Sequence, residues 1–225
     1  MVQAKKQKTG LAVDHIATAN LKSIEDFVEH YLTPSPSIPW TTWTHPNNLR
    51  EFEVSLSSAS ALSEADFEAC FELISETSST DYKTSQDGWK PKAKRKEMKL
   101  LDLKYLLVKD EEGVKAFTSL MPTYEDGIQV VYCYEIHLKP ELQGTGLGSV
   151  LMGHLEEIAA KIPGTERAML TCFLANERGV RFYEKLGYVK YEYSPEPRIL
   201  RNGTRAEVEY IIMSKHIRQN LTTKH

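Results

Sequence analysis

The hydrophobic pattern of this chain switches several times between a helical and a strand period. Apolar residues recur at helical spacing in the stretches 21–32, 63–77, 147–161 and 176–188. β-Branched and aromatic residues predict strands at 49–58, 104–110, 113–120, 130–138, 167–173, 189–193 and 207–214. This order predicts an α/β (α+β) fold, in which a β-meander is followed by β-loop-α-β-α-β around a mixed sheet.

Polar and Pro-rich segments separate these elements. We expect an extended segment at 33–40, a loop at 78–89, a basic helical turn at 91–98 and an acidic turn at 123–129. The chain then divides into three parts. These are residues 1–48 (a basic tip, a helix and an extended segment that pack on the core), 49–215 (the main domain) and 216–225 (a flexible tail).

The composition is that of an ordinary globular protein. The 225 residues are 41% hydrophobic and 26% charged, with a formal net charge of −3 at pH 7. A negative net charge argues against a general nucleic-acid coat, so we expect no stable binding of nucleic acid. No apolar run is long enough to span a membrane and no signal peptide is evident, so we expect an intracellular protein without membrane contact.

The stretch from Val130 to Ser149 contains the clearest chemical signal. A strand is followed by a short connection and by a glycine-rich turn that begins a helix. Such a turn directs several backbone N–H groups to one point, where the helix N-terminus also favours negative charge. A phosphate-bearing ligand would therefore lie beside the strand residues Tyr132, Tyr134 and Glu135.

Two motifs in this half of the chain resemble those of the GNAT acetyltransferase superfamily. The sequence QGTGLG at 143–148 matches the family's pyrophosphate-binding pattern Gln/Arg-x-x-Gly-x-Gly/Ala, and residues 176–188 match Asn-x-x-Gly-x-x-Phe-Tyr-x-Lys-x-Gly-Tyr. The resemblance implies the GNAT fold, a mixed, mostly antiparallel twisted sheet flanked by helices, here with an extra N-terminal helical segment. It also implies an enzyme that uses acetyl-CoA and no metal.

A narrower resemblance is to the NatD branch of this superfamily. It rests on YCYE at 132–135, on the Gly-Trp-Lys, basic and Glu-Met residues within 88–98, and on MLT at 169–171. NatD enzymes acetylate the N-terminal α-amine of histone H4 and of the A-type histone H2, whose chains begin Ser-Gly-Arg-Gly. The resemblance implies direct attack by that amine in a ternary complex, these histone tails as partners, a monomer, and a location in nucleus and cytoplasm.

The resemblance further implies a cofactor site along the strand, the glycine turn and the next helix. Strand backbone groups would pair with the pantetheine arm of acetyl-CoA, and turn backbone groups would bind its pyrophosphate. Asn176 would hydrogen-bond the pantetheine arm, with a helix N-cap as the equal alternative. The residues implied are Ile136, His137, Leu138, Gln143, Gly144, Thr145, Gly146, Leu147, Gly148, Ser149 and Asn176.

Acetyl transfer also needs a neutral amine and a proton for the departing thiolate, and Glu135, Tyr134 and Tyr183 are the catalytic candidates. Glu135 is the candidate general base, directly or through a water, with a solvated or salt-bridged carboxylate as the alternative. Strand alternation puts Tyr134 and Glu135 on opposite faces, so both can serve one cleft only across a β-bulge. Tyr183 occupies the position of the family's tyrosine acid, with packing as the alternative.

A substrate with an early arginine needs carboxylates, because a guanidinium pairs with a planar acceptor. Glu125 is the best single candidate, with a plain solvated turn as the alternative. By resemblance, aromatic walls would limit the pocket to a glycine-rich peptide, and Asp87 stands where the family has a tryptophan. The peptide-binding residues implied are Tyr82, Thr123, Tyr124, Glu125, Tyr132, Tyr134, Thr171, Tyr193 and Tyr210.

The remaining features have simpler interpretations. Cys70, Cys133 and Cys172 lack metal-type spacing and are expected to be buried free thiols. Cys133 and His137 share a strand face but lie about 13 Å apart in an extended chain, which is too far for a thiol–imidazole pair. The basic runs at 5–8 and 92–96 are expected to be solvated, with a nuclear address or a DNA contact as the alternative.

Two rival functions remain open at this point. One is a GNAT enzyme that acetylates a lysine side chain or a small amine. The other is a catalytically silent GNAT module that binds histone tails.

Overall fold

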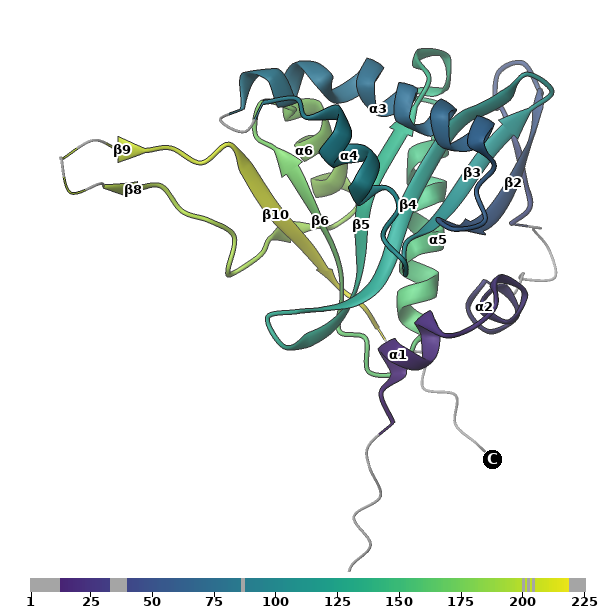
Figure 1. Ribbon diagram of the computed structural model, residues 1–225, viewed down its shortest axis with the longest axis horizontal. Coiled ribbons are helices and arrows are strands. Elements are labelled where there is room, and N and C mark those ends of the chain that lie inside the picture. The colour runs from purple at the N-terminus through teal and green to yellow at the C-terminus, as the bar shows by residue number, and fades with distance from the viewer. Residues whose placement is uncertain are drawn as a thin grey trace, which may run out of the picture.

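The computed structural model describes residues 13–32, 40–85, 88–199, 201, 203 and 205–218, and a large mixed sheet runs through them (Figure 1). Neighbouring strands are antiparallel except for one parallel pair, β5 and β6. In spatial order the strands are β1 (Thr42–Thr44), β2 (Glu51–Ser58), β3 (Lys104–Asp110), β4 (Gly113–Glu125), β5 (Ile128–Leu138), β6 (Arg167–Phe173), β10 (Tyr210–His216) and β7 (Val189–Lys190).

Helices cover both faces of this sheet. In Figure 1, α3 (Glu64–Thr84) and α4 (Pro91–Glu97) lie in front of it, whereas α5 (Leu147–Lys161) and α6 (Glu177–Lys185) lie behind it. The N-terminal helices α1 (His15–Asn20) and α2 (Ile24–Tyr31) pack against β4 and α5. A 3₁₀ turn, η1 (Pro140–Leu142), follows β5, and a hairpin of β8 (Arg198–Ile199) and β9 (Arg205–Ala206) projects from the body.

Each face of the sheet has its own apolar core, and β3 shows why. Tyr105 and Leu107 pack into the core beneath α3, whereas Leu106 and Val108 pack into the core that contains α5. All four side chains are buried. A strand buried on both faces needs a nearly continuous apolar run, which KYLLV supplies. The middle of the sheet is therefore packed on both faces.

Helix α3 is longer than the sequence pattern predicted. Its start is as expected, because Ser63 caps it by accepting a hydrogen bond from the N–H of Asp66 at 3.1 Å. Its end at Thr84 corrects the predicted loop at 78–89. The polar last turns are stabilised by tertiary contacts: the ring of Tyr82 lies 4.9 Å from that of Phe173 and 5.2 Å from that of Trp89.

The acidic turn is shorter than predicted. β4 continues to Glu125 and β5 begins at Ile128, so the expected turn at 123–129 is wrong in extent. Asp126 and Gly127 form the whole loop, with φ values of 48° and 83°. Two successive residues at positive φ are what a type I′ hairpin needs, and an Asp-Gly pair provides them readily.

Other boundaries differ at the edges of the molecule. β1 pairs with β2, so part of the segment predicted as an N-terminal extension belongs to the sheet. The strand predicted at 189–193 shortens to β7, and the β8–β9 hairpin was not predicted. The extended segment at 33–39, the basic run at 5–8 and the tail beyond 218 lie outside the described residues. Within the described chain, no helix combines the length and apolar character needed to cross a membrane.

Candidate active site

Strands β5 and β6 separate halfway along their length. Their parallel pairing joins Val130–Cys133 to Arg167–Leu170 and goes no further. β5 continues to Leu138 and β6 to Phe173, so each has an edge whose backbone groups face a gap between the two strands (Figure 1). The predicted cofactor residues at 136–138 lie on this open edge. A ligand that enters the gap can hydrogen-bond to the strand as an added strand would.

A β-bulge at Tyr134 begins where this pairing ends. In the β4–β5 ladder, Ser119 is opposite Glu135 and Leu120 is opposite Cys133, so Tyr134 is the extra residue. The bulge shifts the side-chain alternation by one position. Tyr134 and Glu135 consequently line the same small cavity, which is the arrangement that a shared cleft requires.

Two cavities meet at the bulge. The larger cavity, of about 680 Å³, is lined by residues of α3, α4, β4, β5, β6 and β10. The smaller cavity, of about 100 Å³, is lined by residues of α3, β5, β6 and α6. Both share Tyr82, Cys133, Tyr134, Thr171 and Phe173. Two ligands can therefore approach one point from different sides.

The glycine-rich turn follows the open part of β5 and begins α5. Gly144 and Gly146 have φ values of +78° and +92°, a left-handed backbone that other residues rarely adopt. No heavy atom lies within 4 Å of the place where a Cβ would stand at either glycine, so this side of the turn is open. Leu147, Gly148 and Ser149 form the first turn of α5, whose N–H groups and dipole favour an anion. The turn therefore fits a pyrophosphate.

Side-chain hydrogen bonds brace this turn. Gln143 Nε2 donates to the carbonyl of Leu138 at 3.1 Å, and Gln143 Oε1 accepts from Nη1 of Arg178 at 2.9 Å. Thr145 Oγ1 donates to the carbonyl of Leu142 at 2.6 Å. Gln143 is thus engaged within the protein, and it holds the guanidinium of Arg178 beside the turn. The glycine motif gave no indication of this cation.

The starts of α5 and α6 pack closely together. A Cβ at Gly148 would lie 3.2 Å from Cζ of Phe182, so this contact favours glycine. Asn176 caps α6, because its Oδ1 accepts from the N–H of Gly179 at 2.8 Å. The capping interpretation of Asn176 is confirmed, and the same side chain lines the smaller cavity.

Glu135 lies in a buried ion-pair network at the bulge. Its Oε1 is 2.7 Å from Nζ of Lys94 on α4, and its Oε2 is 2.6 Å from Nε2 of His137. The side chains of Lys94, Glu135 and His137 are only 8%, 11% and 7% exposed. Lys94 also lies 2.9 Å from Oε2 of Glu97 and 5.0 Å from the centre of the Tyr82 ring. Glu135 is therefore a salt-bridged carboxylate, as the alternative interpretation held, and it lies inside the candidate site.

His137 connects this network to α3. Its Nδ1 is 2.6 Å from Oγ1 of Thr77, and the Thr77 hydroxyl donates to the carbonyl of Leu73 at 2.7 Å. Because a hydroxyl has one hydrogen, the contact with Nδ1 places a hydrogen on that ring nitrogen. Nε2 faces the carboxylate of Glu135, which also accepts. Both ring nitrogens of His137 are thus engaged, one by α3 and one by Glu135.

The network keeps Glu135 ionised. Burial alone would raise the pKa of its carboxyl, but the hydrogen bond and charge of His137 and the ammonium of Lys94 lower that pKa from 4.5 to about 2. An α-amine has a pKa of about 7.7–8.0, so this carboxylate cannot retain a proton taken from it. It can accept a hydrogen bond from the amine or from a water, and it can stabilise positive charge on nitrogen.

Tyr183 and Cys133 both keep their hydrogens in this site. Tyr183 on α6 is buried against the smaller cavity, and burial raises the pKa of its hydroxyl well above 10. This position suits both packing and the donation of a hydrogen bond. Burial also raises the pKa of the Cys133 thiol to about 12, which makes Cys133 a poor nucleophile. All three cysteines are free and buried, as expected.

Most of the predicted peptide-binding residues gather at the larger cavity. The hydroxyl of Tyr132 and Oγ1 of Thr171 lie 2.6 Å apart and connect β5 to β6 where the strands separate. Burial, and then the charge of Asp126, raise the pKa of the Glu125 carboxyl. The predicted residues that line this cavity are Tyr82, Glu125, Tyr132, Tyr134, Thr171 and Tyr210.

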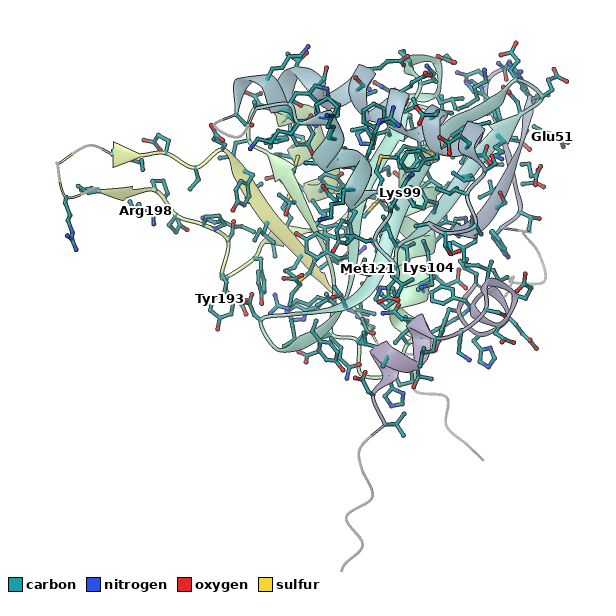
Figure 2. The ribbon with its side chains drawn as sticks, in the orientation of Figure 1. Glu51, Lys99, Lys104, Met121, Tyr193 and Arg198 are labelled. Atoms are coloured by element: carbon teal, nitrogen blue, oxygen red, sulfur yellow. The ribbon has the colours of Figure 1, made fainter. Side chains whose placement is uncertain are left out.

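Three predicted peptide-binding residues are not among those that line either cavity. Thr123 lies in the β4–β5 hairpin, opposite Val130. Tyr124 donates its hydroxyl hydrogen to Oδ1 of Asp14 at 2.8 Å. Tyr193 is exposed and lies toward the base of the projecting hairpin (Figure 2), and it lines neither cavity. The resemblance implied a peptide contact for these three residues, and the structure does not bring them to either cavity.

The fold also adds residues that the sequence analysis did not assign to the site. Trp89, one of the residues that carry the narrower resemblance, lines the larger cavity beside Tyr82. Glu97 and Glu209 bring carboxylates to the same cavity. Glu209 directly precedes β10, whose pairing with β6 could not be read from the sequence. Among the described residues, no group of three or more His, Cys, Asp or Glu side chains could hold a metal.

The fold and the site define the class of protein. Residues 67–188 match the acetyltransferase (GNAT) family, and the chain belongs to this family. The GNAT fold expected from the sequence, with a mostly antiparallel sheet flanked by helices and with N-terminal helices, is confirmed.

A curated protein is similar to this chain over part of its length. The chain is 30% identical to N-alpha-acetyltransferase 40 of Saccharomyces cerevisiae over 156 residues, which covers 58% of this chain and 54% of that protein. The chain thus spans about half the length of this relative.

Solved structures of similar fold include Arabidopsis thaliana NAA60 in complex with a bisubstrate analogue, at 10% identity and a TM-score of 0.52, with 73% of this chain and 98% of that chain covered. Another is the PaiA N-acetyltransferase of Thermoplasma acidophilum in complex with coenzyme A, at 20% identity and a TM-score of 0.52, with 73% and 99% covered. At these identities the likeness shows the fold alone.

Proposed function

We propose that this protein transfers an acetyl group from acetyl-CoA to the N-terminal α-amine of a protein chain. The gap between β5 and β6 carries the proposal, because Glu135 and Tyr183 line the smaller cavity there and the glycine turn follows β5. Membership of the GNAT family supports acetyl-CoA as the donor. The similarity to a relative named N-alpha-acetyltransferase 40 supports an α-amine as the acceptor.

Acetyl-CoA supplies an activated thioester, and residues of the chain perform the remaining work. The turn at 143–148 would bind the pyrophosphate, and the open edge of β5 would bind the pantetheine arm and direct a backbone N–H at the thioester carbonyl. Glu135 would accept a hydrogen bond from the amine, directly or through a water, and stabilise the positive charge that develops on the attacking nitrogen. As the C–N bond forms and the C–S bond breaks, Tyr183 would pass its hydroxyl proton to the departing sulfur and would be reprotonated, through water, by the proton that the attacking nitrogen releases. Tyr134 would enclose the reacting atoms.

The proposed acceptor is the Ser-Gly-Arg-Gly N-terminus of histone H4 and of the A-type histone H2, on which the protein would act as a monomer in nucleus and cytoplasm. Glu125 and Glu209 give the larger cavity two carboxylates for the arginine. Trp89, Tyr132 and Tyr210 line its walls, and bulky walls suit a peptide rich in glycine.

Incubation with acetyl-CoA and an SGRGK peptide tests the acceptor. We expect one acetyl group on the α-amine, and none on a peptide whose N-terminus is blocked. Acetylation that survives the block would instead support a lysine side chain or another amine as the acceptor. Glu125→Gln should raise the KM for the peptide about 10-fold or more, since a charge-assisted hydrogen bond is lost. Glu111→Gln, at an exposed hairpin loop, is the matched control.

Glu135→Gln separates an enzyme from a silent binding module. An enzyme should lose kcat while its affinity for the peptide, measured by calorimetry, stays within about threefold. An unchanged kcat would remove Glu135 from the chemistry. Peptide binding without acetylation by the parent protein would support the silent module.

A further inference from the structure

Lys94 differs from the other lysines of its run. Lys92 and Lys96 on the same helix are exposed, whereas Lys94 is buried. Positions 94 and 98 lie on one face of α4, and Met98 is also buried, so this face points inward. The expectation of a solvated run at 92–96 is therefore wrong for Lys94. A lysine is rarely buried unless its charge is paired, and its partners indicate what it does.

The contacts of Lys94 join three elements at the candidate site. Its Nζ lies 2.7 Å from Oε1 of Glu135 on β5, 2.9 Å from Oε2 of Glu97 on α4, and 5.0 Å from the centre of the Tyr82 ring on α3. Glu135 and Tyr82 line the smaller cavity, and Lys94 lines the larger one. The ammonium therefore lies at the boundary between the two cavities.

The direction of the Glu135 carboxylate depends on two partners. Lys94 holds Oε1 and His137 holds Oε2, so the plane of the carboxylate is set from both sides. Each carboxylate oxygen can accept a second hydrogen bond, which leaves room for a substrate amine or a water. Without Lys94, one oxygen would lose its partner, and the buried carboxylate would lose a cation that offsets its desolvation.

We propose that Lys94 is a positioning residue for acetyl transfer, which holds the Glu135 carboxylate ionised and directed at the acceptor amine without contacting the reacting atoms. This inference rests on the proposed function. The charged and titratable groups that face Glu135 from the surrounding elements are Lys94 and Glu97 on α4, His137 and Cys133 on β5, Tyr82 on α3, Tyr105 on β3 and Tyr183 on α6.

Substitutions at Lys94 test the role through kinetics. Lys94→Met keeps the apolar stem and removes the charge, and we expect kcat on the SGRGK peptide to fall about 10- to 100-fold while both KM values stay within about threefold. The acidic limb of the kcat profile should move to higher pH, because the loss of a nearby cation raises the pKa of the bound amine, which must be neutral to attack, as well as that of Glu135. Lys94→Arg should recover part of kcat. Lys92→Met, at an exposed lysine of the same helix, should change neither quantity.

A double-mutant cycle in urea provides a readout independent of activity. Glu135→Gln should lower the urea midpoint less in the Lys94→Met background than in the parent chain, because the partner is already gone. Lys94→Gln replaces Lys94→Met if the latter does not fold. An additive cycle, or a Lys94→Met protein with the kcat and pH profile of an active parent, overturns the positioning role. A parent chain that acetylates only another amine refutes the proposed acceptor, and the same Lys94 comparison is then made on that amine.

Discussion

Lys104 is a buried lysine whose replacement should make the protein more stable. It lies at the start of β3 and is 3% exposed (Figure 2). Its Nζ is 3.3 Å from Oδ1 of Asn20, 3.2 Å from the carbonyl of Asp102 and 4.8 Å from the centre of the Phe27 ring. No carboxylate of the described residues forms an ion pair with it. Burial therefore lowers the pKa of Lys104 from 10.5 to about 8, against a smaller opposing effect of the Asp102 charge.

This lowered pKa sets the size and the pH dependence of the effect. A change from 10.5 to about 8 corresponds to about 3 kcal/mol, at 1.36 kcal/mol for each pH unit. Below pH 8 the ammonium is charged in both states, so the folded state bears the full cost of burying it. Between pH 8 and 10.5 the unfolded chain binds more protons than the folded one, and stability rises with pH. The cost is therefore present at neutral pH and disappears in alkali.

Lys104→Met removes the charge and keeps a side chain of similar length. We expect the free energy of unfolding at pH 7 to rise by about 2–3 kcal/mol, and Tm by about 5–10 °C. Urea denaturation followed by tryptophan fluorescence at pH 7 and pH 9.5 measures the change, and the advantage should shrink at the higher pH. Lys96→Met, at an exposed position, should stay within about 0.5 kcal/mol of the parent. A Lys104→Met protein that is less stable at pH 7, or equally favoured at both pH values, would refute the reasoning.

Three further changes test the proposed cofactor site. Gly146→Ala puts an L-residue at a φ of +92°. The free energy of unfolding, measured in urea, should fall by about 1–2 kcal/mol, and calorimetry should show weaker CoA binding. Unchanged values would contradict the argument from backbone strain. Arg178→Ala should raise the Kd of CoA about two- to tenfold. The control is Arg181→Ala, because Arg181 pairs with Glu177 at 3.0 Å, and this variant should keep the Kd of the parent. Equal Kd values for the two variants would show that Arg178 does not contact CoA. Tyr183→Phe should lower kcat about 10-fold or more at constant KM; an unchanged kcat would leave packing as its role.

The elements with a strong local signal could be predicted from the sequence. The periodic stretches gave α2, α5, β2, β3 and β6 close to their bounds. The errors have two causes. The polar end of α3 is helical because Tyr82 packs on Phe173, a contact that no window of local sequence shows. The acidic turn is short because the Asp126-Gly127 pair suffices for a hairpin, and that pair stands in the sequence itself.

The residues of the candidate site also differ in how well the sequence predicts them. The glycine turn and Glu135 belong to the motifs QGTGLG and YCYE, so they could be recognised directly. The sequence shows only that Tyr134 and Glu135 need a bulge to share one cleft. Whether the bulge forms depends on the register between β4 and β5. Lys94 and Glu209 reach the site from elements that are distant in sequence, and nothing in their own neighbourhoods distinguishes them from solvated residues.

The burial of Lys94 has a consequence for the chemistry of the enzyme itself. It puts a primary amine of the protein in the cavity proposed for the peptide, at the boundary with the smaller cavity, where a neutral amine could compete with the substrate. Burial would favour that neutral form, but Glu135, Tyr82 and Glu97 outweigh burial and raise the pKa of Lys94 above its usual range. An ammonium has no lone pair with which to attack a thioester. The same ion pairs that hold the carboxylate in place therefore protect the enzyme from acetylating itself.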